Sequence, residues 1–383
     1  MSRTVLVLGA GLGGMVAAQT LRRLLPREHR VVLVEREAQH VFPPSLLWLM
    51  VGERSAEAIS RPCAHAARPG IELVRGAVSA IDPAAKTVQV GEQTLRGDAL
   101  VVALGAEYAP QAIPGLAEAG LCIYTLEGAS AIREALERFD SGRLVVLTAT
   151  PQYKCPAGPY EAALLVDNYL RQRGRRDRIT LEFYAAEPGP MMVAGAAVSA
   201  GVRAMVEARG IAYRPEHQVK SVDPQARRIE FANGAAAGFD LLLYVPPHRA
   251  SEAVKAAGLT NESGWIPVDR HTLETRFPGV YAVGDITVIP LKMGRPLPKA
   301  GVFAHGQAEA VAHTIAHQWT GRGKPGRFEG EGTCFIEAGG GRAGMGSGNF
   351  YAEPLPEVRL REPGLLWHGA KVLYEKYWLW SRF

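Results

Sequence analysis

The sequence predicts an α/β protein built from two Rossmann-like dinucleotide-binding domains and ending in an amphipathic helical segment. Two strand, turn, helix and strand patterns start at Val5 and at Arg143, and each closes with an acidic residue after its second strand. A third pattern, from Leu365 to Phe383, places apolar residues at the spacing of one helical face. With 383 residues the chain is longer than a single core usually supports, which also favours two domains.

The composition excludes several classes of protein. Hydrophobic residues make up 47% of the chain and charged residues 21%, as is typical of a globular protein. The net charge of +5 is spread thinly, and we interpret the one basic run, Arg171 to Arg178, as a solvent-facing helix end. No nucleic-acid partner is therefore expected. Four cysteines are too few for a disulfide scaffold, and no metal site is predicted.

The chain shows no sign of export or of a membrane span. The first strand begins near Val5 without an apolar leader, and no run approaches the ~18 to 20 apolar residues that cross a bilayer. We therefore expect a cytoplasmic protein whose contact with a membrane is peripheral.

The first nucleotide-binding turn follows the strand Val5 to Leu8. Gly9 permits a tight turn, Gly11 lets the backbone approach a pyrophosphate, and Gly14 allows close packing of helix and strand. The helix that follows presents its positive N-terminal end to the phosphates. Glu35, at the end of the next strand, stands where an acidic side chain accepts hydrogen bonds from ribose hydroxyls.

Two later segments favour FAD as the cofactor of this fold. Asp98 to Gly105 (DALVVALG) and Phe277 to Asp285 (FPGVYAVGD) resemble the two signature strands of flavoproteins with two dinucleotide-binding domains. The resemblance implies that Gly105, Gly284 and Asp285 lie at the cofactor, with Asp285 holding the ribityl chain.

The second nucleotide-binding pattern has lost its glycine turn. After the strand Arg143 to Thr148 the chain reads ATPQYKCPAGPYE, and these bulky side chains and prolines keep a pyrophosphate from the backbone. NADH is therefore not expected as the electron donor. Pro159 suits the first position of a helix, so Cys155 stands just before a helix N-terminus, which is expected to stabilise its thiolate.

The same loop resembles the active-site loop of sulfide:quinone oxidoreductases, and the resemblance runs almost from end to end of the chain. It implies a glutathione-reductase-like flavoprotein that oxidises sulfide to polysulfide or sulfur and passes electrons through FAD to a membrane quinone. The segments that carry it besides the loop are Val41 to Gly52, Tyr244 to His248, Pro298 to Gly301, the surroundings of Cys334, and Lys371 to Leu379.

The resemblance also implies the site residues. Cys155 and Cys334 correspond to the redox pair that flanks the flavin, and Cys122 falls where many relatives keep a third cysteine. Lys299, just before a helix, corresponds to a positive charge near the pyrimidine edge of the flavin. Glu161 corresponds to a carboxylate that moves protons.

Four parts of the chain are expected: residues 1–108 and 266–322 form the FAD-binding domain, 109–265 the second domain, and 323–383 a C-terminal region. The final helix is predicted to lie on the inner face of the cell membrane through an apolar face, while Lys371 and Glu375 lie elsewhere on its circumference. Besides sulfide, quinone and this membrane surface, a second copy of the chain is a possible partner. The apolar face consists of Leu366, Ala370, Leu373, Tyr377 and Trp380.

Three alternatives remain open. A flavocytochrome c-like sulfide dehydrogenase subunit would attach FAD through a cysteine near His40 to Phe42, where this chain has none. A type II NADH:quinone reductase would need the missing glycine turn. A non-catalytic sulfur carrier or redox sensor is suggested by Leu126 and Glu127, and by residues 190–202, where relatives often have histidines and this chain has none.

Overall fold

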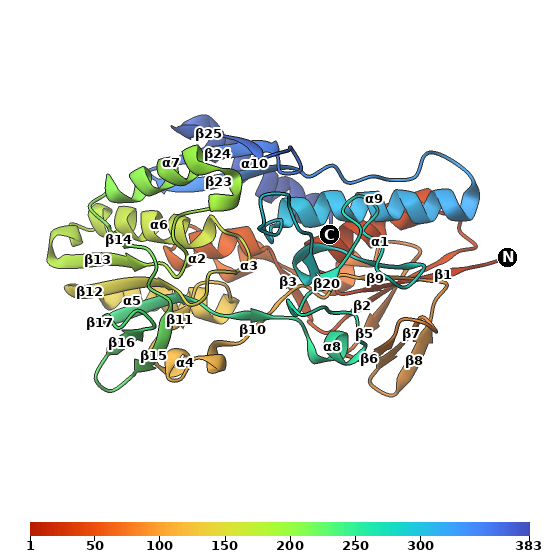
Figure 1. Ribbon diagram of the computed structural model, residues 1–383, viewed down its shortest axis with the longest axis horizontal. Helices are drawn as coiled ribbons and strands as arrows, with labels where there is room; N and C mark the ends of the chain where they lie inside the picture. Colours follow the sequence, from red (N-terminus) through yellow and green to blue (C-terminus); the bar gives the residue numbers. More distant parts are fainter.

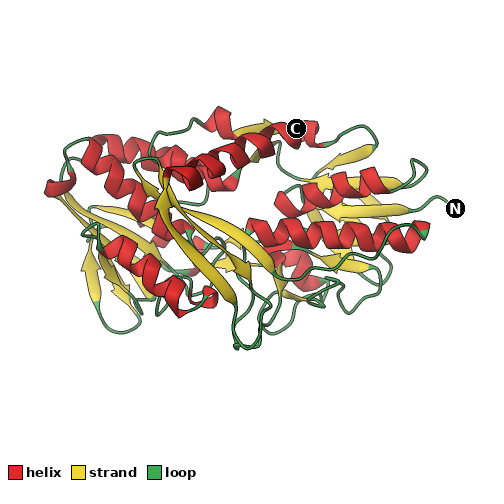
Figure 2. Cartoon of the chain, turned by 90° about the horizontal axis from the view of Figure 1, so that it is seen from above, coloured by secondary structure: helices red, strands yellow, loops and turns green.

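The structure is a computed structural model that describes residues 1–383. Two five-stranded parallel sheets lie in an elongated molecule, with helices laid over both groups of strands (Figures 1 and 2). The first sheet has the order β21 (Val280–Ala282), β9 (Ala99–Val102), β1 (Thr4–Leu8), β2 (Arg30–Glu35) and β5 (Ile71–Arg75). The second has the order β11 (Leu121–Cys122), β18 (Leu241–Val245), β12 (Gly142–Thr148), β13 (Ile179–Tyr184) and β14 (Ala212–Arg214). The predicted pair of Rossmann-like domains is confirmed.

The first sheet is covered on both faces, as expected for parallel strands made almost entirely of apolar residues. Helices α1 (Leu12–Leu24) and α9 (Gly301–Thr320) lie side by side on one face (Figure 1). The other face packs on the three-stranded sheet β6 (Val78–Asp82), β7 (Thr87–Val90) and β8 (Gln93–Arg96). The residues that follow β1, β9 and β21 line one cavity together with residues of the second domain.

The second sheet is covered in the same way. Helices α5 (Leu126–Arg138), α6 (Gly158–Gln172) and α7 (Ala196–Glu207) share a core with α2 (Leu46–Met50) on one side. The small sheet β15 (Val219–Asp223), β16 (Arg228–Phe231) and β17 (Ala236–Gly238) packs on the other side.

The chain passes between the domains at two strands that pair with each other, β10 (Glu107–Tyr108) and β19 (His248–Arg249). The chain enters the second domain after β10 and packs with the first domain again from Ala250 onward. Ala250, Val254 and Trp265 pack in the core of the first domain, because α8 (Glu252–Ala256) covers the β6 to β8 sheet.

The C-terminal region adds the antiparallel strands β23 (Glu331–Gly339), β24 (Arg342–Asn349) and β25 (Glu357–Gly364) and then α10 (Leu365–Ser381). These elements lie along the upper edge of the molecule in Figure 1, against α6 and α7. The remaining short elements are α3 (Ala56–Ile59), α4 (Leu116–Ala119), β3 (Gln39–Val41), β4 (Ser60–Pro62), β20 (Ile266–Pro267) and β22 (Thr287–Val288).

Helix α10 is docked by its polar side, which the sequence had not indicated. Lys371 and Glu375 are buried together with Trp378, whereas the apolar residues Leu366 and Trp380 point outward. Trp380 is 79% exposed and Leu366 70%. None of the helices combines the length and the apolar character that crossing a bilayer requires.

Candidate active site

A cavity of about 1190 Å³ lies where the two domains and the C-terminal strands meet. It begins at the carboxyl ends of β1 and β9, passes the Cys155 loop, and reaches the inner side of α10 at Lys371 and Tyr374. Ligands of open parallel sheets bind at these strand ends. The volume is large enough for a dinucleotide together with smaller reactants.

The glycine turn after β1 has the geometry that a pyrophosphate requires. Gly9 has φ +98°, and a Cβ there would lie 2.6 Å from the carbonyl oxygen of Ala103. A Cβ on Gly14 would lie 1.8 Å from the carbonyl oxygen of Gly9, so only glycine allows α1 to pack this closely. Gly11, by contrast, has no atom within 4 Å of an added Cβ and lines the cavity at the start of α1. An anion can therefore approach the backbone at Gly11.

The other expected cofactor residues surround the same cavity. Glu35 ends β2 and accepts hydrogen bonds from the backbone N–H groups of Ala10, at 2.6 Å, and Glu37, at 2.7 Å. These bonds fix the carboxylate at the cavity wall. Gly105 has φ +65° with open space beside it, and Gly284 precedes Asp285 in a short turn at the end of β21. These residues fit a dinucleotide cofactor.

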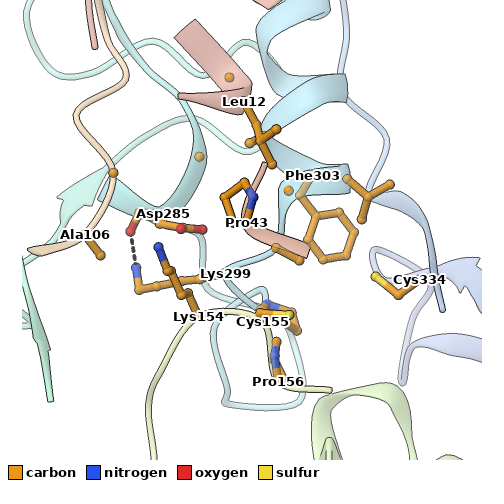
Figure 3. Close-up of a pocket in the computed structure, with 18 of the residues that line it drawn as sticks. Leu12, Pro43, Ala106, Lys154, Cys155, Pro156, Asp285, Lys299, Phe303 and Cys334 are labelled. Atoms are coloured by element: carbon orange, nitrogen blue, oxygen red, sulfur yellow. Dashed lines mark hydrogen bonds between the residues drawn. The ribbon is translucent and has the colours of Figure 1, made fainter. Parts of the chain in front are cut away.

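Two lysines point toward Asp285, in the region between the two domains (Figure 3). Lys299 donates to the backbone oxygens of Asp285, at 2.6 Å, and Thr287, at 2.9 Å, and its ammonium lies 3.6 Å from the ring centroid of Trp265. Burial lowers the pKa of Lys299 to about 8, so its ammonium form remains the main form at neutral pH but loses its proton more easily than that of a free lysine.

The second lysine, Lys154, was not singled out in the sequence. Its ammonium lies 4.7 Å from the ring centroid of Tyr108. Burial alone lowers the pKa of Lys154, but Tyr108 and Asp285 outweigh it and the net shift is upward. Lys154 therefore keeps its proton to a higher pH than Lys299 does. Only folding reveals this role, because Asp285 comes from the other domain.

Three hydrogen bonds to the backbone of Cys155 hold its loop in place. Cys155 adopts φ +51°, its N–H donates to the carbonyl of Lys299 at 2.7 Å, and its carbonyl accepts from the N–H of Gly158 at 2.8 Å. The hydroxyl of Tyr124 donates to the same carbonyl at 3.0 Å. A Cβ on Gly158 would lie 2.6 Å from the Tyr124 hydroxyl, so glycine is needed there for the tyrosine to reach the loop.

Cys155 and Cys334 line the same cavity, and both are free thiols (Figure 3). The expected stabilisation of the Cys155 thiolate by the helix N-terminus is wrong. Burial, followed by the nearby Glu161 and Cys334, raises the pKa of Cys155 to about 12. Burial and Glu161 also raise the pKa of Cys334 to about 11. The backbone N–H of Gly158, at the start of α6, lowers the pKa of Cys155, but desolvation outweighs this effect.

Cys122 does not line the cavity. It lies on β11 and packs between the two cores of the second domain, and burial raises the pKa of its thiol. Tyr124, two residues further, is the part of this segment that touches the Cys155 loop.

Glu161 lines the cavity and is paired inside the protein. One of its oxygens, Oε1, accepts from the ammonium of Lys371 at 2.5 Å and from the backbone N–H of Glu337 at 2.9 Å. Glu161 belongs to α6, Lys371 to α10 and Glu337 to β23. The sequence placed Lys371 on the polar circumference of α10 but could not indicate that this side would be buried.

The place of a second nucleotide is filled by a buried hydrogen-bond network. Glu187, after β13, accepts from Thr148 Oγ1 at 2.7 Å and from the hydroxyl of Tyr160 at 2.7 Å. The hydroxyl of Tyr153, from the Cys155 loop, donates to it as well. In a nucleotide site this carboxylate would bind a ribose, but here it accepts hydrogen bonds from side chains of the protein. This agrees with the missing glycine turn.

This network is expected to stabilise the second domain measurably. Tyr160→Phe removes one donor from a buried carboxylate and should lower the free energy of unfolding by about 1 to 3 kcal/mol. Tyr169→Phe, on the same helix, is the matched control, because the buried Tyr169 hydroxyl has no hydrogen-bond partner. Chemical denaturation of both variants gives the difference, and equal stabilities would contradict the importance of the network.

The chain matches the family model described as pyridine nucleotide-disulphide oxidoreductase over residues 3–149 and 169–309. A sulfide-quinone reductase of Aquifex aeolicus (strain VF5) is 29% identical over 400 residues, which cover 100% of this chain and 91% of that protein. The mitochondrial sulfide:quinone oxidoreductase of Mus musculus is 23% identical and covers 92% of this chain and 79% of its own length. The X-ray structure of the Aquifex aeolicus sulfide:quinone oxidoreductase matches with a TM-score of 0.88 at 27% identity, over 99% of this chain and 91% of that one. The similarity that the motifs indicated is confirmed.

Proposed function

The chain belongs to the pyridine nucleotide-disulphide oxidoreductase family, and from this premise we propose that it is a sulfide:quinone oxidoreductase that uses FAD. It oxidises sulfide to polysulfide or sulfur and passes the electrons to a quinone. One observation carries the proposal: Cys155 and Cys334 share a single cavity with a glycine turn that fits a dinucleotide. The names of the most similar relatives, which state both substrates, support it.

FAD would be held along the wall that the first domain provides. Its pyrophosphate would lie at Gly11 and its adenosine ribose at Glu35, while Asp285 would hold the ribityl chain. Bound there, FAD supplies a two-electron acceptor beside the cysteines. Lys299 and Lys154 hold positive charge on this side of the cavity, where negative charge develops on reduction.

The two cysteines perform the sulfur chemistry. Hydrosulfide attacks a sulfur of the oxidised pair, one cysteine retains the new sulfur as a persulfide, and the other leaves as a thiolate. The thiolate and the outer sulfur of the persulfide then join in a trisulfide bridge, and this oxidation releases one proton and two electrons, which bound FAD would accept. Glu161, close enough to perturb both thiols, is placed to take the proton.

The quinone would approach from the side of α10. The cavity reaches Ala370 and Tyr374 on this helix, at the border of its exposed apolar face. An exposed apolar helix face next to residues that line the cavity suits a protein that lies on a membrane and takes a lipid-soluble substrate from it. We place this surface on the inner side of the cell membrane.

Anaerobic reduction by two donors in parallel tests the donor side of the proposal. Sulfide should reduce the protein-bound flavin rapidly, whereas NADH should leave it oxidised, because Glu187 and the Cys155 loop occupy the second nucleotide site. Flavin absorbance reports both reactions. Fast reduction by NADH together with no reduction by sulfide would favour an NADH:quinone reductase instead.

A further inference from the structure

Four titratable residues lie in a row from the protein surface to the cavity, joined by two close contacts and one longer ion-pair contact. His368 Nδ1 lies 3.0 Å from Glu337 Oε2, Glu337 Oε1 lies 3.9 Å from the ammonium of Lys371, and Lys371 lies 2.5 Å from Glu161. The side chain of His368 is 26% exposed, whereas that of Glu337 is only 1% exposed. The series therefore leads from solvent to the two residues that line the cavity, Glu161 and Lys371.

We propose that His368 and Glu337 form the solvent end of a proton path that supplies Lys371 and Glu161, an inference that rests on the proposed function. Reduction of a quinone consumes two electrons and two protons. The proton given to a quinone oxygen by Lys371 or Glu161 is replaced from Glu337, which is in turn supplied by the imidazolium of His368 and finally by water.

The orientation of His368 suits this direction of transfer. Its Nδ1 faces both oxygens of Glu337, at 3.0 and 3.2 Å, so the ring donates there. Its Nε2 has no partner in the protein and is not one of the buried polar atoms, so it remains open to water. An imidazole with one nitrogen on a buried carboxylate and the other in solvent can carry protons between them.

Two buried members of the series, Glu337 and Lys371, have pKa values shifted upward. Burial raises the pKa of Glu337. Burial alone lowers the pKa of Lys371, but Glu161 and Glu337 outweigh it and the net shift is upward. The neighbouring α2 contributes only the uncharged ring of Trp48, which lies 4.7 Å from the Lys371 ammonium and beside His368.

A second polar contact joins α10 to the rest of the protein through Glu375, separately from Lys371. Arg54 pairs with Glu375 of α10 at 3.0 Å, and Ser45 donates to the same carboxylate at 2.6 Å. This second contact already fastens α10 to the first domain. The pair of His368 and Glu337 is therefore not the sole means of docking the helix.

His368→Gln tests the path. We expect quinone turnover to fall on the order of tenfold or more at high pH, where protons are scarce, while reduction of the flavin by sulfide stays unchanged. Added imidazole should restore much of the lost turnover, because it can enter from solvent. His313→Gln, on the exposed face of α9, is the matched control and should behave like the unmodified protein.

A second variant separates proton transfer from docking. Glu337→Gln keeps the size and can still bond to His368, but it cannot pass a proton, so turnover should fall and imidazole should not restore it. Normal turnover of His368→Gln beside an active unmodified protein would overturn the proton path alone. Loss of flavin reduction in parallel with turnover, without rescue by imidazole, would also overturn it, since the pair would then be structural. An unmodified protein that does not reduce quinone with sulfide would contradict the proposed function instead.

Discussion

Cys155→Ser and Cys334→Ser are each expected to lower sulfide oxidation by on the order of a thousandfold or more. A serine hydroxyl cannot form the sulfur-sulfur bonds through which sulfide is captured and through which its electrons are released. Flavin content should remain, because neither residue belongs to the glycine turn. Stopped-flow reduction by sulfide, with the flavin content of each variant measured beforehand, gives the comparison.

Two other cysteines provide the controls. Cys63 is buried at the start of a short helical turn after β4, and it does not line the cavity. Cys63→Ser should therefore keep its activity. Cys122→Ser is the sharper comparison, since Cys122 falls where many members of the similar family keep a third cysteine, while the structure places it outside the cavity. Activity of Cys122→Ser near that of the unmodified protein would limit the chemistry to two cysteines. Full activity of Cys334→Ser would show that the pair is wrongly assigned.

Replacing the exposed apolar residues of α10 should abolish binding to lipid vesicles. Leu366, Leu373 and Trp380 are 70%, 70% and 79% exposed, and each can contribute about 1 to 3 kcal/mol when it enters a membrane interface. A triple change to glutamine should therefore weaken vesicle binding by at least about a hundredfold, without altering net charge. Cosedimentation with vesicles measures the loss.

The same variant should reduce its flavin with sulfide at the normal rate, because its three substitutions face away from the cavity. Turnover with a lipid-soluble quinone in vesicles should fall with binding. Deleting the whole helix is a poorer experiment, since it also removes Lys371 from Glu161 and Glu375 from Arg54. Unchanged sedimentation and quinone turnover of the triple variant would show that the apolar face of α10 is not the membrane contact.

The sequence by itself determined the elements whose chemistry is local. Gly9, Gly11 and Gly14 could be assigned separate roles because a strand, a tight turn and a helix follow one another within one short stretch. The sequence also shows directly that the second glycine turn is absent. In the structure, hydrogen bonds around Glu187 fill the place of the second nucleotide. Family resemblance brought Cys334 to the same site, which no local pattern could have done.

Only the tertiary structure decided how charges are paired and which side of the last helix faces outward. The spacing of residues in α10 defined an apolar and a polar side, but burial of the polar side depends on Glu161, Glu337 and Arg54, which come from three distant segments. The pKa of Cys155 is raised, whereas the sequence predicts a lowered one, for the same reason. A helix N-terminus is visible in the sequence, whereas desolvation and a neighbouring carboxylate arise only when separate segments pack together, and at this site they are the larger effects.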